Sequence, residues 1–316
     1  MQRRGLLGIE PLAREEIQKI LDRAKFYQPL QARTGRKLDT LRGKTIIHLF
    51  YESSTRTRTS FEIAAKRLGA DTVSITAKGS SADKGESLLD TLNTLAAMRP
   101  DAIVMRHSAS GAPHFLARLL ETPIVNAGDG SHEHPTQALL DALTILDHKP
   151  TLAGLRVAII GDILHSRVAR SNLHLLTKFG AEVVLCGPPP MLPKEFECFH
   201  PAVKLTFRIE EAIASSDVIM MLRMQFERQN APLTPSANEY FHFYGLRLEH
   251  LKAARPDAIV MHPGPINRGR EISSEVADFP RSVILTQVEN GIAVRMAVLD
   301  LMLANQDPAL RSQKPE

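Results

Sequence analysis

The feature that most constrains the fold of this chain is the alternation of short apolar runs with helical stretches. The run Thr45–Phe50 (TIIHLF) predicts a buried strand. A helix is predicted next, over residues 54–68, because apolar side chains recur at helical spacing and Gly69 stands where a C-cap belongs. The pattern continues with strands predicted at 72–75, 102–105 and 124–125, and helices at 86–98 and 114–120. Such alternation favours a parallel sheet with helices on both faces.

The second half of the chain repeats this plan, with strands predicted at 156–160, 182–185, 218–222 and 258–261. A helix predicted over Pro135–His148 runs into Lys149-Pro150, and a new strand begins six residues later, so we place a domain boundary there. The expected fold class is α/β, with two doubly wound parallel-sheet domains joined by interdomain helices. The domains would be 1–149 and 150–286, with a C-terminal helix and tail at 287–316 packing back on the N-terminal domain.

Length and composition exclude several classes of protein. At about 150 residues per domain, 316 residues suffice for two, and 43% hydrophobic residues argue against wholesale disorder. No apolar run approaches the ~20 residues of a membrane span, and no signal peptide is expected at the N-terminus. The sequence contains two cysteines, Cys186 and Cys198, and neither is in a CxxC pair. Two cysteines are too few for a disulfide framework, so we expect a reduced, cytoplasmic protein.

The net charge is too small to predict a polyanionic partner. The formal charge is +4 over the whole chain, and aromatic residues make up only 5%. A nucleic-acid binder would need a basic stripe with interleaved aromatics, and none occurs. We therefore expect neither nucleic acid nor membrane as a partner, and the useful question becomes where the positive charge lies.

The strongest chemical signal is the segment 52–59 (ESSTRTRT), which directly follows the first predicted strand. Its position at a helix start favours an anion, because backbone N–H groups and the helix dipole point there. Ser54, Thr55 and Thr57 add hydroxyl donors, and Arg56 adds a guanidinium suited to phosphate oxygens. The alternative is an ordinary N-cap with solvated arginines. Four hydroxyls and two arginines in residues 54–59 favour the anion site.

Two further residues follow strands of the same predicted sheet. Arg106 comes just after the strand at 102–105 and would be a second cation at that edge. His134 stands at a helix start, suited to donating to a carbonyl or oxyanion, although a plain helix cap is an equal alternative. His132 and His134 form only an His-x-His pair without matched ligands, which is weak support for zinc, so we expect no metal.

The second half offers groups suited to carboxylates. Arg167, Arg223 and Gln225 each follow a predicted strand and would share one sheet edge. Gly264 and Pro265 offer backbone carbonyls and a rigid turn, and their peptide bond is a candidate for the cis form. Nucleotide fingerprints, a Ser-His-Asp set and a reactive cysteine are all absent from the sequence. We therefore expect no cofactor, and chemistry that depends on positioning and electrostatic stabilisation.

Two motifs occur in a fixed order ahead of a second α/β half, Ser54-Thr55-Arg56-Thr57-Arg58 and then His134-Pro135-Thr136-Gln137. With these motifs the chain resembles the aspartate/ornithine carbamoyltransferases, and the resemblance extends over about residues 41–303. His262-Pro263-Gly264-Pro265 lacks the cysteine of the ornithine enzymes, and no Ser-Met-Gly occurs. The pair Arg223-x-Gln225 and the loop from Ser80 to Glu86 are similar to the aspartate branch. The resemblance implies carbamoyl transfer from carbamoyl phosphate to L-aspartate, in pyrimidine synthesis.

The resemblance also implies a role for each matching residue. The phosphate would be held by Ser54, Thr55, Arg56 and Thr57, and the carbamoyl end by Arg106, His134, Gln137 and the backbone of Gly264 and Pro265. The aspartate carboxylates would be bound by Arg167, Arg223, Gln225 and Lys84. The catalytic set implied is Arg56, Thr57, Arg106, His134 and Lys84.

The resemblance further implies a homotrimer with shared active sites, in which Ser80 and Lys84 come from the neighbouring subunit. It leaves a regulatory chain and a dihydroorotase-like protein both open as partners. Asp83 and Ser108 depart from the pattern of many relatives, which bears on kinetics rather than on the reaction. The alternatives are a catalytically dead scaffold, which would have lost ligands that are present here, and a carbamoyltransferase for another amine.

Overall fold

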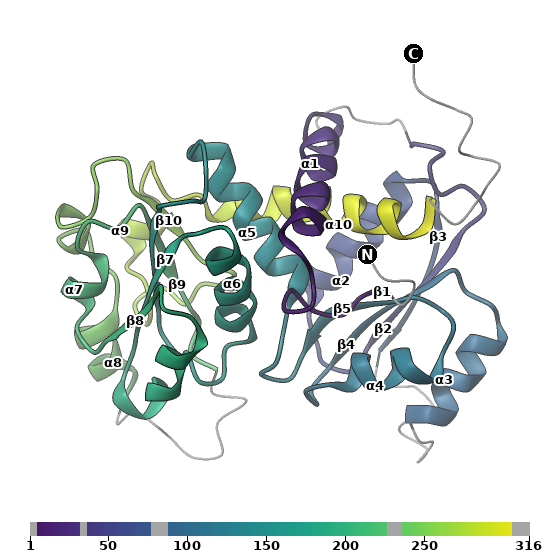
Figure 1. Cartoon of the computed structure of the whole chain (residues 1–316), viewed down its shortest axis with the longest axis horizontal. Helices are drawn as coiled ribbons and strands as arrows, with labels where there is room; N and C mark the ends of the chain where they lie inside the picture. Colours follow the sequence, from purple (N-terminus) through teal and green to yellow (C-terminus); the bar gives the residue numbers. More distant parts are fainter. Residues whose placement is uncertain (1–4, 32–36, 77–87, 226–235, 305–316) are drawn as a thin grey trace. The chain divides into compact units, whose positions relative to one another are not determined.

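The computed structural model describes residues 5–31, 37–76, 88–225 and 236–304 (Figure 1). The chain divides into two compact units, one formed by residues 1–139 and 289–316 and the other by residues 140–288. Two helices carry the chain between units, α5 (Pro135–His148) and α10 (Ile284–Leu303). The predicted fold class is confirmed, because each unit is built on a five-stranded parallel sheet flanked by helices.

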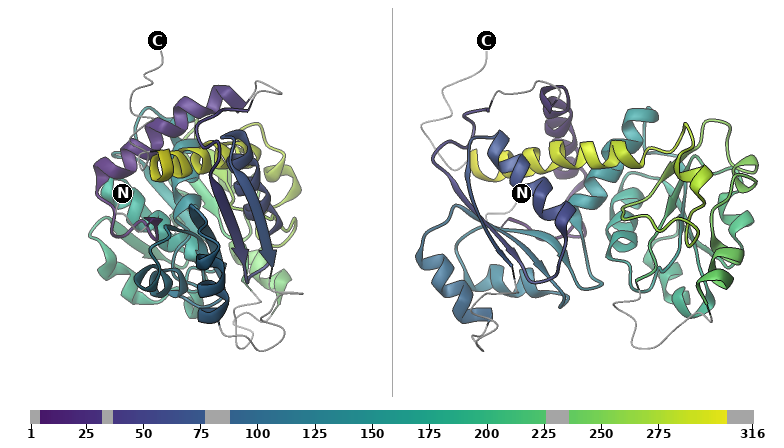
Figure 2. Two further views of the ribbon diagram at one scale, coloured as in Figure 1. Left: turned by 90° about the vertical axis from the view of Figure 1, so that its right-hand side faces the viewer. Right: turned by 180° about the vertical axis from the view of Figure 1, so that it is seen from behind.

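The first unit has the strand order β1-β5-β4-β2-β3. Its strands are β1 (Gly5–Leu6), β2 (Thr45–Phe50), β3 (Asp71–Thr76), β4 (Ala102–His107) and β5 (Ile124–Asp129). Its helices are α1 (Arg14–Gln31), α2 (Thr55–Arg67), α3 (Leu88–Ala97) and α4 (Ala112–Leu119). Figure 2 shows α2 and α10 on one face of this sheet and α3 on the other.

Side-chain alternation along β2 explains why helices cover both faces of that sheet. Ile47 and Leu49 are buried in a cluster with residues of α3 and α4. His48 points to the opposite face, where its ring lies 6.3 Å from that of Phe61 on α2. Gly69, expected to end α2, has φ +88°, and a Cβ there would lie 2.5 Å from the carbonyl oxygen of Leu38.

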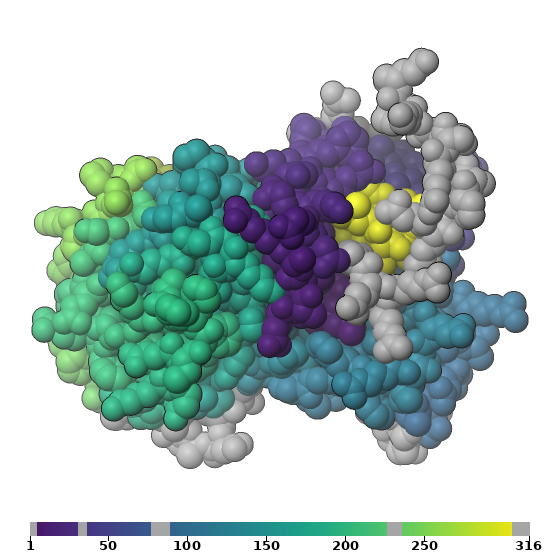
Figure 3. All heavy atoms as spheres, in the orientation of Figure 1, coloured from purple at the N-terminus to yellow at the C-terminus, as the bar shows by residue number. Residues whose placement is uncertain are grey.

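The helix α1 lies across α10 within the first unit (Figures 1 and 3). The hydroxyl of Tyr27 donates to Asp300 at 2.8 Å, and the Gln28 amide donates to Asn290 at 2.8 Å. Arg23 forms an ion pair with the same Asp300 carboxylate. These contacts attach α10 to the N-terminal helix α1.

The second unit has the strand order β10-β9-β6-β7-β8. Its strands are β6 (Arg156–Ile160), β7 (Glu182–Cys186), β8 (Val203–Thr206), β9 (Val218–Met221) and β10 (Ile259–Met261). Its other helices are α6 (Arg167–Lys178), α7 (Ile209–Ile213), α8 (Ala237–Tyr244) and α9 (Ser274–Ala277), with 3-10 turns at Pro189–Met191, Lys194–Phe199 and His250–Lys252. Figure 1 shows α6 on one side of the sheet and α7, α8 and α9 on the other.

The elements that the sequence analysis did not predict include β1, α1 and β8. None of the helices in the described ranges combines the length and apolar character that crossing a membrane requires. Both cysteines are free; Cys198 is exposed, whereas Cys186 lies in the core, where burial raises the pKa of its thiol to about 12. The Cys186 thiol therefore stays protonated at neutral pH.

Candidate active site

The predicted anion-binding segment joins β2 to α2 in the first unit. Ser54 precedes the helix with extended backbone, and among the described residues its side chain accepts no capping hydrogen bond from the helix. Its hydroxyl donates instead to that of Thr57 at 3.0 Å. The first turn of α2 contains no acidic residue, and its leading N–H groups have no intrahelical acceptor. This end of α2 can therefore receive an anion.

Arg106 lies beside this segment because of the strand register. It is paired with Phe50 of β2, and the N–H of Tyr51 donates to its carbonyl at 2.9 Å. The buried guanidinium contacts Glu52 Oε1 at 2.5 Å through Nη2 and the carbonyl of Ala127 at 3.3 Å through Nη1. The strand order thus brings Arg106 to the anion segment.

Sequence reasoning assigned no role to Glu52, which holds Arg106 in place. The sequence does contain a signal for such a role, an acidic side chain at the start of an anion-binding segment. A carboxylate there would repel an anionic ligand unless a cation neutralised it. Naming that cation requires the pairing of β2 with β4, which the sequence pattern does not provide.

A tight loop between β5 and α5 carries His134. The Asp129 carboxylate is fully buried and accepts hydrogen bonds from the N–H of Gly111 at 2.6 Å, the Asn126 amide at 2.8 Å and the N–H of Glu133 at 3.1 Å. Burial alone would raise the pKa of Asp129, but hydrogen bonds, led by the one from His132, outweigh it and hold the pKa below its ordinary value. The carboxylate therefore stays ionised and fixes the loop.

Glu133 attaches this loop to the N-terminal segment. Its carboxylate accepts from the N–H of Ile9 at 2.8 Å and from that of Glu10 at 3.1 Å. A Cβ at Gly8 would lie 2.4 Å from the same carboxylate, so the close approach requires glycine. The next residue, His134, is buried, and its carbonyl accepts the N–H of Gln137 at 2.9 Å at the start of α5.

In the second unit, the predicted carboxylate-binding residues follow β6 and β9. Ser166 caps α6 by accepting the N–H of Ala169 at 3.1 Å, which makes buried Arg167 the first residue of the helix. Arg223 and Gln225 are in contact, since Nη2 of the arginine donates to Oε1 of the glutamine at 3.2 Å. The two side chains therefore lie together after β9.

A turn after β10 carries Gly264 and Pro265, whose peptide bond is cis. The N–H of Gly264 donates to Nδ1 of buried His262 at 2.8 Å, so the neutral ring carries its proton on Nε2. That nitrogen lies 3.3 Å from Oε1 of Glu271, which is also fully buried. The imidazole and the carboxylate together support the turn.

Ser80 and Lys84, the two residues expected from a neighbouring subunit, lie outside the described residues. The others form one group in each unit. Ser54, Thr55, Arg56, Thr57, Arg106, His134 and Gln137 belong to the first, and Arg167, Arg223, Gln225, Gly264 and Pro265 to the second. Arg106 lies within the last residues of β4, and the other residues of both groups follow the carboxyl ends of parallel strands, where α/β sheets bind ligands.

Two parallel α/β units, each with hydrogen-bond donors suited to anions at the carboxyl edge of its sheet, define a two-domain enzyme for small anionic substrates. Two family models match the chain: the aspartate/ornithine carbamoyltransferase carbamoyl-P binding domain over residues 4–147 and the Asp/Orn binding domain over residues 153–302. The chain belongs to the aspartate/ornithine carbamoyltransferase family.

Individual relatives agree with this assignment. The chain is 73% identical over 299 residues to an aspartate carbamoyltransferase catalytic subunit of Solibacter usitatus, covering 95% of this chain and 99% of the relative. It is similar to the Trypanosoma cruzi aspartate transcarbamoylase solved with carbamoyl aspartate and phosphate, with TM-score 0.87, 32% identity and 96% of each chain covered. Ornithine carbamoyltransferase from Pyrococcus furiosus matches with TM-score 0.85 and 31% identity, covering 95% of this chain and 97% of the other. The backbone fold is thus shared by both branches.

Proposed function

We propose that this chain transfers the carbamoyl group of carbamoyl phosphate to the α-amine of L-aspartate, giving N-carbamoyl-L-aspartate and phosphate. The observation that carries the proposal is the position of Arg106, which Glu52 and the β2–β4 register hold beside the hydroxyl-rich start of α2. A phosphate and a neighbouring carbonyl oxygen both need donors of this kind. The catalytic-subunit relative and the structure that holds carbamoyl aspartate and phosphate support the aspartate branch.

In the first unit, Ser54, Thr55, Arg56 and Thr57 hold the phosphate. Arg106, His134 and Gln137 bind the carbamoyl end, and backbone groups of Gly264 and Pro265 orient its amide. Thr57, Arg106 and His134 donate to the carbonyl oxygen. The support for these roles is the position of these residues at strand ends and the burial of Thr57, Arg106 and His134.

The aspartate carboxylates are bound by Arg167, Arg223 and Gln225, whose guanidinium and amide groups can donate hydrogen bonds to carboxylate oxygens. Lys84, with Ser80, completes the site from the neighbouring subunit of a homotrimer. The support here is the hydrogen bond between Arg223 and Gln225 and the capped helix that begins at Arg167.

In this mechanism the neutral amine of aspartate attacks the carbamoyl carbon, and a carbon–nitrogen bond forms. Negative charge develops on the carbonyl oxygen, where three preorganised donors stabilise it by roughly 3–4 kcal/mol each, as in other oxyanion holes. The bond from carbon to the bridging phosphate oxygen then breaks, and Arg56 and the α2 N-terminus stabilise the phosphate that leaves. The phosphate accepts the proton of the amine, so no side chain is required as a general base, and because the amine attacks the carbon directly no side chain acts as a covalent nucleophile.

The cellular context follows from the product. N-carbamoyl-L-aspartate has the carbon and nitrogen skeleton of a dihydropyrimidine ring, so we propose a role in de novo pyrimidine synthesis. A cytoplasmic location fits two free cysteines, one of them exposed. A regulatory chain and a dihydroorotase-like protein remain the two candidate partners, and no role for nucleic acid or membrane is proposed.

The test measures ureido product from carbamoyl phosphate with aspartate, with ornithine and with other amino acids. We expect turnover with aspartate and none with ornithine. Arg106→Ala should lower kcat by about 10²–10³-fold, the usual cost of one oxyanion donor. Arg42→Ala, at an exposed arginine of the same unit, is the matched control and should leave kcat unchanged. Turnover with ornithine alone would contradict the aspartate assignment.

A further inference from the structure

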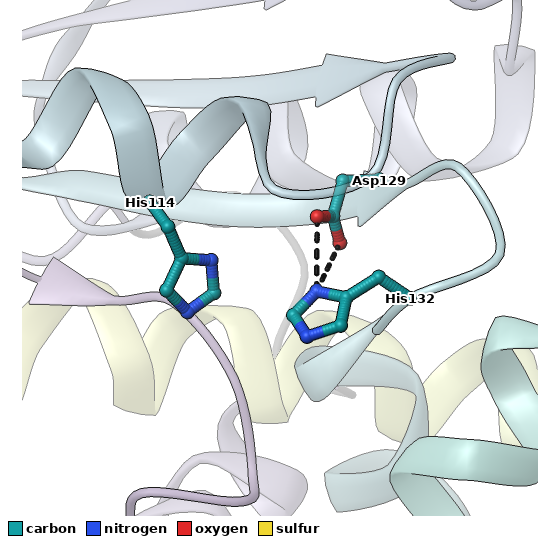
Figure 4. Close-up of side chains that lie close together, drawn as sticks. All are labelled: His114, Asp129 and His132. Atoms are coloured by element: carbon teal, nitrogen blue, oxygen red, sulfur yellow. Dashed lines mark hydrogen bonds and ion pairs between the residues drawn. The ribbon is translucent and has the colours of Figure 1, made fainter.

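A cluster of metal-ligating side chains lies in the first unit, beside the loop that carries His134. It consists of His114 of α4, Asp129 at the end of β5 and His132 of the following loop, and Figure 4 shows the three side chains converging. One ring nitrogen from each histidine and one carboxylate oxygen lie within 4.8 Å of one another. The proposed carbamoyl transfer uses none of these three residues.

We propose that His114, Asp129 and His132 form a binding site for one divalent transition-metal ion of the Zn²⁺ type. Imidazole nitrogen and carboxylate oxygen are ligands that Zn²⁺ and Co²⁺ share, whereas Mg²⁺ and Ca²⁺ prefer oxygen alone. Two imidazoles and one carboxylate leave a fourth position for water. The proposal is independent of the carbamoyl transfer reaction.

The carboxylate of this cluster is held in advance of any ion. Gly111, Asn126 and Glu133 all donate to Asp129, so its orientation does not depend on His132. Supporting hydrogen bonds of this kind orient the ligands of established metal sites. His132 Nδ1 and Asp129 Oδ2 form a hydrogen bond of 3.0 Å, and an ion that replaced its proton would need the two atoms at about 3.3 Å, the spacing between two ligands of tetrahedral zinc.

The remaining ligand, His114, has a polar atom that the fold leaves unsatisfied. Its Nδ1 is buried and has no hydrogen-bond partner among the described residues. Its ring lies edge to face with that of His132, with 5.2 Å between the centroids. A bound ion would give this imidazole the partner it lacks.

An ion can reach the cluster, since the His132 side chain is 35% exposed. Once bound, it would connect α4, the end of β5 and the loop two residues before His134. Glu10 and Glu133 form a second group with His132, again within 4.8 Å, and add negative charge around the same ring. The expected consequence is a stiffer β5–α5 loop and a first unit that unfolds at higher temperature.

The test uses the full chain, stripped with a chelator and titrated with Zn²⁺ by calorimetry in a buffer that does not bind metal. We expect one ion per chain and a higher unfolding midpoint with zinc. His114→Gln and His132→Gln should each weaken binding by more than about tenfold and abolish the zinc-dependent rise. His148→Gln, at an exposed histidine of α5, is the matched control and should bind zinc as the wild-type chain does.

His114→Gln is the decisive variant because its Nδ1 contributes no hydrogen bond within the described residues, so the fold should tolerate the change. Zinc bound with equal affinity by the wild-type chain and His114→Gln would overturn the proposal. Loss of zinc in His132→Gln but not in His114→Gln would overturn it as well, and would assign the ion to Glu10, His132 and Glu133. Absence of stoichiometric binding to the wild-type chain would also refute it.

Discussion

At the scale of single residues, the candidate site depends on buried polar side chains whose partners are remote in sequence. Arg106 is paired with Glu52, and Glu133 binds the N–H groups of Ile9 and Glu10. A buried charge without such a partner would be strongly destabilising, so these pairs are part of the fold as well as of the site. They fix Arg106 and the loop that carries His134 in the candidate site.

His48 is buried without such a partner. It lies on β2, fully buried, and the described residues offer neither ring nitrogen a hydrogen bond. Burial lowers the pKa of His48 from 6.5 to about 4. Between these values the unfolded chain binds a proton that the folded chain does not. The free energy of unfolding should therefore fall as the pH decreases from 6.5 to 4, by up to about 3 kcal/mol from this residue.

His48→Leu should remove this part of the acid sensitivity. Urea unfolding at several values between pH 4 and pH 7.5 measures the change, and the difference between variant and wild type isolates His48 from other histidines. His148→Leu, at an exposed histidine, should follow the wild-type curve. An unchanged pH dependence in His48→Leu would show that the buried imidazole does not limit stability in acid.

At the scale of elements, the start of α6 contributes to stability and carries Arg167, which we propose binds aspartate. Ser166 is buried, its hydroxyl caps the helix, and the next residue is Arg167. Ser166→Ala should lower the free energy of unfolding of the second unit by about 1 kcal/mol, the usual contribution of an N-cap. Because the cap also sets where Arg167 begins the helix, the KM for aspartate should rise.

The measurement combines urea unfolding with steady-state kinetics at varied aspartate. Ser273→Ala is the matched control, since Ser273 caps α9 by accepting the N–H of Val276. The control should lose stability without a change in KM. Equal effects of the two variants on KM would show that α6 has no special part in binding aspartate.

The elements also show which helices and strands the sequence pattern can predict. The limits predicted for β2 and β6 from continuous apolar runs match the observed limits, because both strands are buried on two faces and therefore have such runs. The edge strand β8 was missed, since only Val203 of its four residues is buried and no apolar run exists to find. The helix α1 was overlooked although Ile17, Ile20, Leu21 and Ala24 have helical spacing and are buried.

The candidate site was predictable only in part, for a related reason. Residues near the carboxyl end of a strand can be found from the chain alone. Arg106 was expected just after a strand and lies within the last residues of β4, and Arg223 follows β9 as expected. Their partners depend on which strands are neighbours and in what register, as the contact of Arg106 with Glu52 and the approach of His114 to His132 illustrate. Pairing of this kind is a property of the sheet and has no local pattern in the sequence.

At the scale of the whole molecule, the sharing of active sites between subunits is the remaining question. The proposed trimer takes Arg56 from one chain and Lys84 from its neighbour at each site. In a closed ring of three identical subunits, every subunit uses the same two different surfaces. A chain that lacks Arg56 can then still lend its Lys84, and a chain that lacks Lys84 can still supply its Arg56.

Mixtures of Arg56→Ala and Lys84→Ala chains should therefore recover activity that neither variant has alone. With equal amounts and random reassembly, about one quarter of the sites combine an intact Arg56 with an intact Lys84 from the neighbour. We expect about a quarter of wild-type turnover after reversible dissociation and mixing. The matched control mixes Arg56→Ala with Arg106→Ala, which remove two groups of the same chain and should restore nothing. If tagged mixed trimers form and the first mixture stays inactive, Lys84 does not act across the interface.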